Sequence, residues 1–154
     1  MHPMPEIEFA FLADAVDAPP GQKFNVLGGG ITQIAGAAFP LVHPHLALVT
    51  GLTLTAPEAG REHELRIALL DPDGNEQAST SVTIVAQPQP GGRDALLTLG
   101  VDLWHVEFRM PGVYSMRLLV NGSERKRLAL VLVTAPGQQV VPGSEPPGGQ
   151  HWVT

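Results

Sequence analysis

One stretch constrains the fold more than any other part of the chain. Residues 111–133 read PGVYSMRLLVNGSERKRLALVLV, with two alternating apolar runs on either side of Asn121-Gly122. Asn-Gly between such runs is the strongest local signal for a β-hairpin. A two-residue loop would set inward residues of one strand opposite outward residues of the other. We therefore predict a three-residue loop, Val120-Asn121-Gly122, with a bulge at Gly122 and Tyr114 opposite Leu128.

This register assigns a face to each side chain of the hairpin. The predicted inward residues are Tyr114, Met116, Leu128 and Leu130, and the predicted outward residues are Arg117, Arg125 and Arg127. Basic side chains beside a hairpin tip are typical of a solvated strand edge, so we do not interpret them as a phosphate-binding patch.

The same alternation recurs along the chain between turns rich in proline and glycine. Strands are predicted over residues 7–15, 23–34, 46–54, 65–69, 79–85 and 95–108, in addition to the hairpin. The glycines at 28–30 predict a bulge or sharp bend. A change from odd to even apolar positions near Leu103-Trp104 predicts a bulge or a break there. Residues 35–45 are predicted to be a connector. About eight strands without a helical stripe predict an all-β fold, a single antiparallel β-sandwich that is immunoglobulin-like or related.

The chain divides into a folded part and a tail. Residues 1–134 are predicted to form the sandwich, since a chain of 154 residues is long enough for one domain with its own core. Eight of the twenty residues in 135–154 are Pro or Gly, so this extended C-terminal tail cannot form a core alone. If the tail docks, Trp152 with Val153 is the expected anchor, because an aromatic side chain buries a large area. Whether it docks or stays unanchored is left open.

Charge and composition exclude several classes of function. The chain has no cysteine, which excludes disulfides, thiolate metal sites and cysteine nucleophiles. Its net charge of −6 argues against binding to nucleic acid or to an anionic membrane surface. No signal peptide and no apolar window long enough to span a bilayer is found, so a cytoplasmic location is expected.

Chemistry-bearing residues are sparse. The best metal candidate is His43-Pro44-His45, because two imidazoles two residues apart in an extended chain can share one face. His63, His105 or Asp102 could supply a third ligand; alternatively, both histidines are exposed and idle in a connector. No nucleophile, base and orienting residue fall into a recognised pattern. We therefore expect no catalytic residue, no cofactor and no enzyme activity.

Several segments resemble a known family. They are FLADAVD, GQKFNVLGGGITQI, LVTGLTL, HELRIALLDPDGNE and the hairpin that Pro-Gly-x-Tyr opens, together covering residues 7–133. The chain resembles a bacterial family of small β-sandwich proteins whose function is unknown. The resemblance implies the fold and a cytoplasmic bacterial origin, and it implies no catalytic residue.

Three functions are considered on this basis. The first is a non-enzymatic structural or protein-interaction module that binds a protein partner or self-associates through its sheet edges and tail. The second is a sandwich that binds a small ligand or carbohydrate, with Trp104 as a stacking surface. The third is a metal-dependent enzyme using His43 and His45. Trp152, Val153 and Trp104 are the predicted interaction residues.

Overall fold

The computed structural model describes residues 4–19 and 23–136 of the chain. These residues form ten strands and a single 3-10 turn, η1, at Pro90–Gly92. The strands are β1 (Glu6–Ala13), β2 (Ala15–Asp17), β3 (Asn25–Leu27), β4 (Gln33–Gly36), β5 (Leu41–Leu54), β6 (His63–Leu70), β7 (Glu76–Ile84), β8 (Ala95–Phe108), β9 (Gly112–Val120) and β10 (Ser123–Thr134). The predicted all-β class is confirmed. No helix in this part of the chain is long and apolar enough to cross a membrane.

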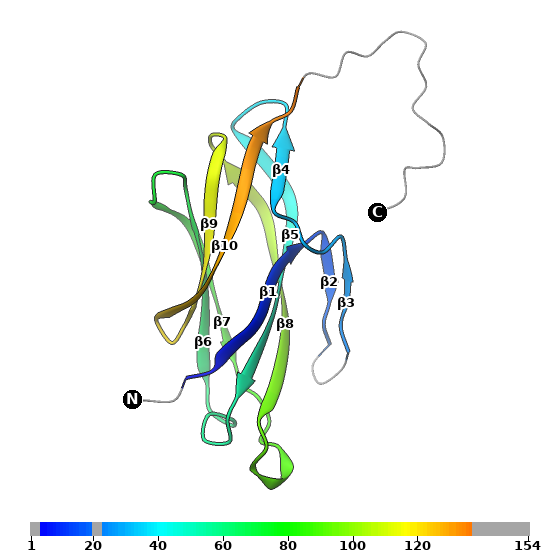
Figure 1. The fold of residues 1–154 in the computed structure, drawn as a ribbon, viewed down its shortest axis with the longest axis vertical. Coiled ribbons are helices and arrows are strands. Elements are labelled where there is room, and N and C mark those ends of the chain that lie inside the picture. Colours follow the sequence, from blue (N-terminus) through cyan, green and yellow to red (C-terminus); the bar gives the residue numbers. More distant parts are fainter. Residues whose placement is uncertain (1–3, 20–22, 137–154) are drawn as a thin grey trace, which may run out of the picture.

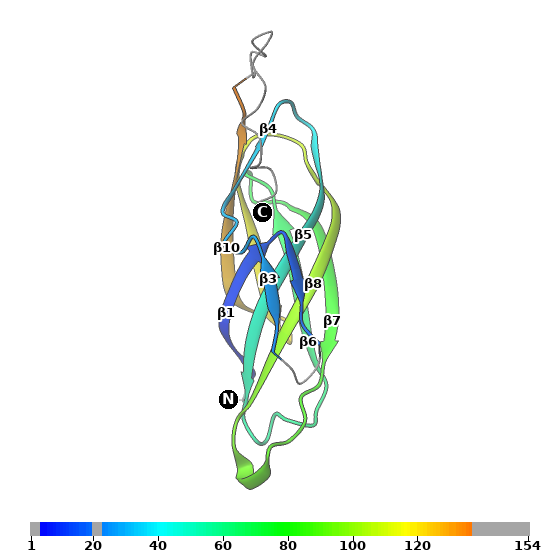
Figure 2. The same ribbon diagram turned by 90° about the vertical axis from the view of Figure 1, so that its right-hand side faces the viewer.

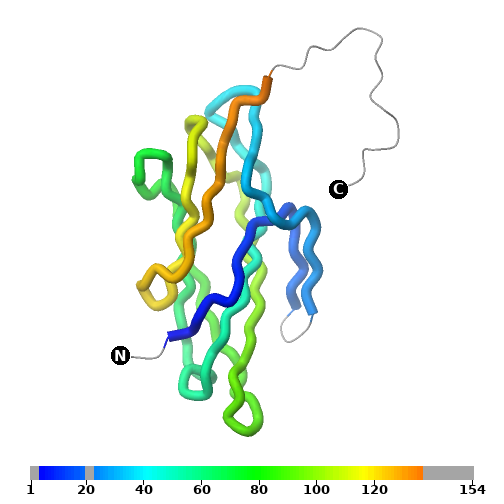
Figure 3. The backbone as a smooth tube through the Cα atoms, in the orientation of Figure 1, coloured from blue at the N-terminus to red at the C-terminus, as the bar shows by residue number. Residues whose placement is uncertain are grey.

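The strands form a smaller sheet in the order β1-β5-β8, a larger sheet in the order β4-β10-β9-β6-β7, and a separate hairpin, β2-β3. In Figure 1 strands β10, β9, β6 and β7 of the larger sheet lie on the left, the smaller sheet lies beside them, and β2-β3 lies on the right. The connections from β5 to β6 and from β7 to β8 pass between the sheets at the lower end of Figure 3. The pairing is not purely antiparallel as predicted, because β4 runs parallel to β10.

Two of the predicted strands are each divided into two, which raises the number from about eight to ten. The predicted strand 7–15 breaks at Asp14, whose N–H donates to Leu27 O at 3.0 Å. The predicted strand 23–34 bends sharply at the glycines, which is the second of the two predicted alternatives, a bulge or a sharp bend. Gly28 has φ +61°, and a Cβ there would lie 2.0 Å from Asp14 Oδ2, so only glycine fits.

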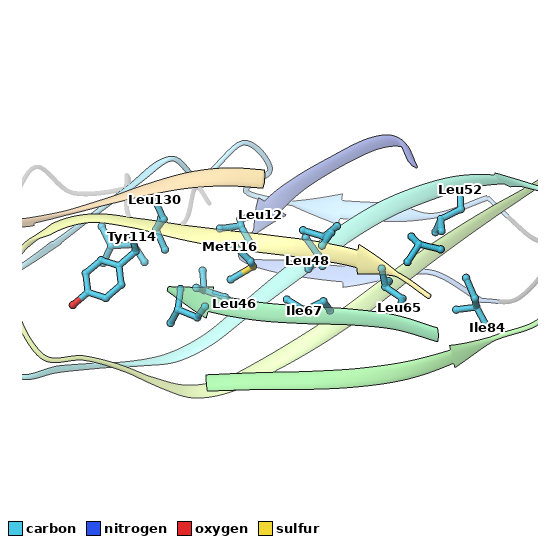
Figure 4. Close-up of a cluster of buried hydrophobic side chains, with 14 of the residues drawn as sticks. Leu12, Leu46, Leu48, Leu52, Leu65, Ile67, Ile84, Tyr114, Met116 and Leu130 are labelled. Atoms are coloured by element: carbon cyan, nitrogen blue, oxygen red, sulfur yellow. The ribbon is translucent and has the colours of Figure 1, made fainter. Parts of the chain in front are cut away.

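The smaller sheet, β1-β5-β8, and the larger sheet, β4-β10-β9-β6-β7, share one hydrophobic core (Figure 4). Leu46, Leu48, Leu52 and Leu54 of β5 point into it, as the even-numbered period predicts. The opposite face of β5 is also buried, because Ala47 and Val49 pack under the β2-β3 hairpin. Figure 2 shows this hairpin lying in front of the smaller sheet. The central strand of the smaller sheet is therefore covered on both sides.

The β9–β10 hairpin corrects the predicted loop. Val120 pairs with Ser123, so the loop has two residues, and both Asn121 (φ +50°) and Gly122 (φ +84°) are left-handed. The bulge lies instead between Glu124 and Lys126, where the register shifts. Tyr114 consequently faces Leu130, and Met116 faces Leu128; the predicted Tyr114–Leu128 pair is wrong. The predicted inward face is confirmed, since all four residues belong to the core or pack against it.

Two of the three outward arginines of this hairpin, Arg117 and Arg127, are tied together by one carboxylate. Glu124 Oε1 accepts hydrogen bonds from Arg117 Nε at 2.9 Å and Arg127 Nε at 2.9 Å. The hydrogen bond from Arg127, followed by that from Arg117, lowers the pKa of Glu124 below its ordinary value. The lowered pKa favours the charged form in the folded state.

The Glu124 cluster should give stability a pH-dependent component that Glu124→Gln removes. A carboxylate with a lowered folded-state pKa stabilises above its unfolded pKa, and this contribution disappears as the pH falls through the folded pKa. Because the group is exposed, the effect is small. Urea denaturation at neutral and acidic pH should show the two proteins converging in stability as the pH falls. A difference that stays constant over this range would contradict the assignment.

Strand β8 shows the predicted change of phase, but it continues unbroken from Ala95 to Phe108 with no register shift against β5. Leu103 and Val106 both pack against the core, although their positions differ in parity, and His105 between them has φ +51°. The predicted connector 35–45 is wrong in its second half, because β5 begins at Leu41 and includes both His43 and His45. A proline is tolerated inside this strand because the register places Pro44 opposite the irregular His105. At that position no hydrogen bond from the residue's nitrogen is required.

The predicted tail, 135–154, is described only at Ala135 and Pro136. Ala135 N–H donates to Gly36 O at 2.8 Å, which extends the contact between β4 and β10. Trp152 and Val153 lie outside the described residues. The domain boundary at residue 134 stays a prediction.

Candidate interaction site

A cleft of about 410 Å³ opens between β7 and β8, where the larger sheet extends past the edge of the smaller one. Strand β8 is an edge of the three-stranded sheet and β7 is an edge of the five-stranded sheet. The apolar lining comes from residues in or against the core, namely Ile67, Leu69, Leu103, Val106 and Met116, and from the exposed Ala78 and Trp104. The polar lining is Gln77, Ser79, Thr80, Asp102, His105, Glu107 and Arg109.

The inner face of β7 is uncovered beside this cleft. Ala78 pairs with Leu69 and Thr80 pairs with Ile67. Cross-strand partners share a face of a sheet, so Ala78 and Thr80 are on the same side as these two core residues. Both are nevertheless exposed, because the smaller sheet ends at β8. One further strand beside β8 would cover them.

A single side chain bridges the two edges. The register between β6 and β7 shifts so that Leu69 faces Ala78 and Leu70 faces Glu76, which leaves Gln77 as the extra residue of a bulge. Gln77 Nε2 donates a hydrogen bond to Glu107 O on β8. Within the described residues, Gln77 Oε1 is buried and has no hydrogen-bond partner. Buried acceptors are normally paired, so this atom marks an incompletely satisfied position.

Trp104 lies at the rim of the cleft. Its cross-strand partner is His45, and the two rings lie against each other at a tilt of 32°, with centroids 4.2 Å apart. His45 Nε2 donates to Asp102 Oδ1 at 2.7 Å, which holds the imidazole under the indole. Trp104 is still 65% exposed, so one face of the indole is available. The predicted interaction residue is therefore accessible and has a fixed orientation.

The two histidines of the predicted metal site fall on opposite sides of the smaller sheet. His43 pairs with Val106, which packs against the core, whereas His45 pairs with the exposed Trp104. The change of phase at Pro44 separates them. Of the three proposed third ligands, Asp102 is the one that is hydrogen-bonded to His45. No group of three His, Cys, Asp or Glu side chains suited to a metal ion occurs in residues 4–19 and 23–136.

His63 belongs to a separate network at the hairpin tip. It is 8% exposed, and its Nε2–H donates to Glu58 O at 2.8 Å. Its Nδ1 accepts a hydrogen bond from Asn121 Nδ2 at 3.0 Å, and Asn121 Oδ1 accepts one from Glu64 N–H at 3.0 Å. Both ring nitrogens are thus engaged: Nδ1 holds the β9–β10 loop against β6, and Nε2 holds the connection between β5 and β6.

The sequence singles out Trp104, which lies at the cleft, but it gives no indication of the β7 side. Residues 79–81, Ser-Thr-Ser, read as strand residues facing water, and Thr80 is indeed exposed although it points inward. A local pattern carries no information about how far one sheet extends past another. The bulge that directs Gln77 toward β8 has no sequence signal either, since neither glycine nor proline marks it.

Three comparisons place the chain among known proteins. Residues 8–133 match a family of unknown function, DUF6941, which confirms the resemblance to such a family. None of the curated proteins matches the chain. The solved structure of Pseudomonas fluorescens alkylpurine DNA glycosylase AlkC, bound to DNA containing an abasic site analog, is similar at 14% identity and a TM-score of 0.46. That similarity covers 84% of this chain and 30% of the glycosylase chain.

Proposed function

Because the chain belongs to DUF6941, a family of unknown function, its role must be inferred from its own site, and we propose a non-enzymatic protein-interaction module. Its ligand is an extended polypeptide segment that docks in the cleft between β7 and β8. One observation carries the proposal: the larger sheet extends past the smaller one and leaves Ala78 and Thr80 exposed on its inner face.

Physical chemistry favours a polypeptide for this cleft. An inner sheet face next to an unpaired edge strand is a ready template for another strand, which supplies both apolar cover and main-chain hydrogen bonds. The apolar floor of Ile67, Leu69 and Met116 provides the burial that binding requires. A strand from a second copy of the chain meets the same requirements, so self-association is one form of this function.

The strand order supports the finer proposal of an immunoglobulin-like sandwich. By position in the chain, β1, β5 and β8 correspond to strands A, B and E, and β6, β9 and β10 correspond to C, F and G. Tyr114 near the start of β9 bonds back to Met110, as in the tyrosine corner of such folds. Strand D, which would lie beside β8, is the one without a counterpart in the described residues. The cleft occupies its place.

Two substitutions on one strand test the proposal. Thr80→Lys places a charge inside the cleft, and Thr83→Lys places the same charge on the opposite face of β7, where Thr83 is exposed beside Glu64. Random peptides of about ten residues, the upper length of an ordinary strand, are displayed and selected on the immobilised full-length protein. The selected peptide is then titrated against the wild type and both variants by calorimetry.

We expect Thr80→Lys to weaken peptide binding by about tenfold or more, because a desolvated and unpaired charge opposes docking. Thr83→Lys should bind like the wild type. Selection of no peptide, or equal loss in both variants, would rule out the cleft as a polypeptide site.

The exposed indole of Trp104 supports a second candidate, the binding of a small planar ligand or a sugar ring. Such a ligand would stack on the indole at the rim of the cleft and would not need the inner face of β7. A panel of sugars followed by thermal unfolding separates the candidates, since a bound ligand raises the midpoint. A rise abolished by Trp104→Ala and unaffected by Thr80→Lys would favour the second candidate; no rise with any sugar would dismiss it.

A further inference from the structure

We propose that the docked polypeptide adds as a strand to the free edge of β8, and that its main chain replaces the Gln77 carboxamide there. This inference rests on the proposed function and specifies how the ligand is recognised. The ligand is identified by its peptide groups, in an extended conformation, rather than by one side chain in a pocket.

The first support is the state of the β8 edge. Along its length β8 pairs with β5, from Leu41–Phe108 to Leu54–Ala95, and within the described residues its other edge has no partner strand. Glu107 O points away from β5, because it accepts its hydrogen bond from a side chain of the other sheet. An outward carbonyl on an edge strand is the acceptor that an incoming strand uses.

The second support is the chemistry of Gln77. A carboxamide presents the same donor and acceptor as a peptide group. In the structure its Nε2 donates to Glu107 O, as the N–H of a neighbouring strand would. Its Oε1 is buried and unpaired within the described part of the chain, which costs free energy. Gln77 is therefore an incomplete substitute for a strand, and its release returns the unpaired oxygen to water.

The third support is the surface on either side of the vacant strand position. Side chains of an added strand alternate between the two faces of the sheet. Those that point inward would rest on Ala78 and Thr80. Those that point outward would lie beside Trp104 and Asp102, an indole and a carboxylate on the outer face of β8. The ligand is thus a segment with apolar residues at alternate positions and a cationic residue between them, since Lys or Arg suits both outer groups.

His105 restricts which strands can add. Its φ of +51° interrupts the regular edge within the cleft. A local irregularity of this kind makes an edge strand a poorer template for indiscriminate pairing. The hydrogen bond from Gln77 to Glu107 O also opposes indiscriminate pairing, because it occupies an acceptor of the β8 edge. A ligand must pair across this irregular edge and displace Gln77, which makes the site selective.

N-methylation of the selected peptide tests the pairing directly. Each residue is methylated in turn on its main-chain nitrogen, and binding to the full-length protein is measured. In an added strand every second N–H points to β8, so alternate positions should weaken binding by about tenfold or more while the others change little. Gln77→Ala should strengthen binding by about three- to tenfold, because no bridge has to be broken.

The outcomes separate this inference from the proposed function. A flat methylation profile with Thr80→Lys still defective would keep the cleft as the docking site and overturn strand addition. Unchanged or weaker binding by Gln77→Ala, in a variant whose unfolding midpoint is unaltered, would overturn the replacement of its carboxamide. Absence of any peptide ligand would overturn both.

Discussion

Replacement of Tyr114 by alanine should lower the free energy of unfolding by about 3–5 kcal/mol, the range for truncating a buried aromatic residue. The ring is fully buried, and it meets Phe108 edge-on with centroids 5.1 Å apart. It sits where the chain crosses from β8 in one sheet to β9 in the other. The loss would therefore remove packing at a connection between the sheets as well as in the core.

The matched variant Tyr114→Phe separates the ring from its hydroxyl. The hydroxyl donates to Met110 O at 2.8 Å and accepts from Met110 N–H at 3.3 Å. Removing it should cost about 1–3 kcal/mol, because the main-chain groups of Met110 lose their partner. Chemical denaturation of all three proteins gives the two contributions. Equal losses in both variants would mean that the ring contributes little, contrary to its burial.

Replacement of Asn121 by alanine should cost about 2–3 kcal/mol, a large effect for an exposed loop residue. Two causes add: alanine is strained at the left-handed φ of +50°, and the hydrogen bonds to His63 and Glu64 are lost. Asn121→Gly retains the backbone freedom and loses only the bonds, so it should be less destabilising by about 1 kcal/mol. Urea denaturation measures both. If the glycine variant is as unstable as the alanine variant, backbone strain contributes nothing here.

The hairpin illustrates how far a sequence pattern determines a structure. Its alternation predicted which side chains face the core, and this holds for Tyr114, Met116, Leu128 and Leu130. The same pattern could not distinguish a bulge in the loop from one at Glu124 and Lys126, because both restore the same alternation. Faces are therefore more predictable than cross-strand partners.

The candidate site was less predictable than the fold. Trp104 stood out as an aromatic residue at a change of phase, and it is exposed at the rim. The cleft itself depends on two sheets of unequal width and on the bulge at Gln77. Both arise from pairing between distant segments, which local periodicity does not report. The parallel partnership of β4 with β10 was missed for the same reason.

The β4–β10 partnership also has a consequence for the timing of folding. It joins Gln33 to Val131, which are 131 − 33 = 98 positions apart in the chain. At about 5–20 residues per second, a ribosome needs about 5–20 s to make the second strand after the first. Throughout that interval β4 has no place in a sheet, and the buried side chain of Ile34 lacks the cover that it finally receives. Strand β10, the last of the described strands, thus completes the larger sheet, and the nascent chain must protect its early strands until then.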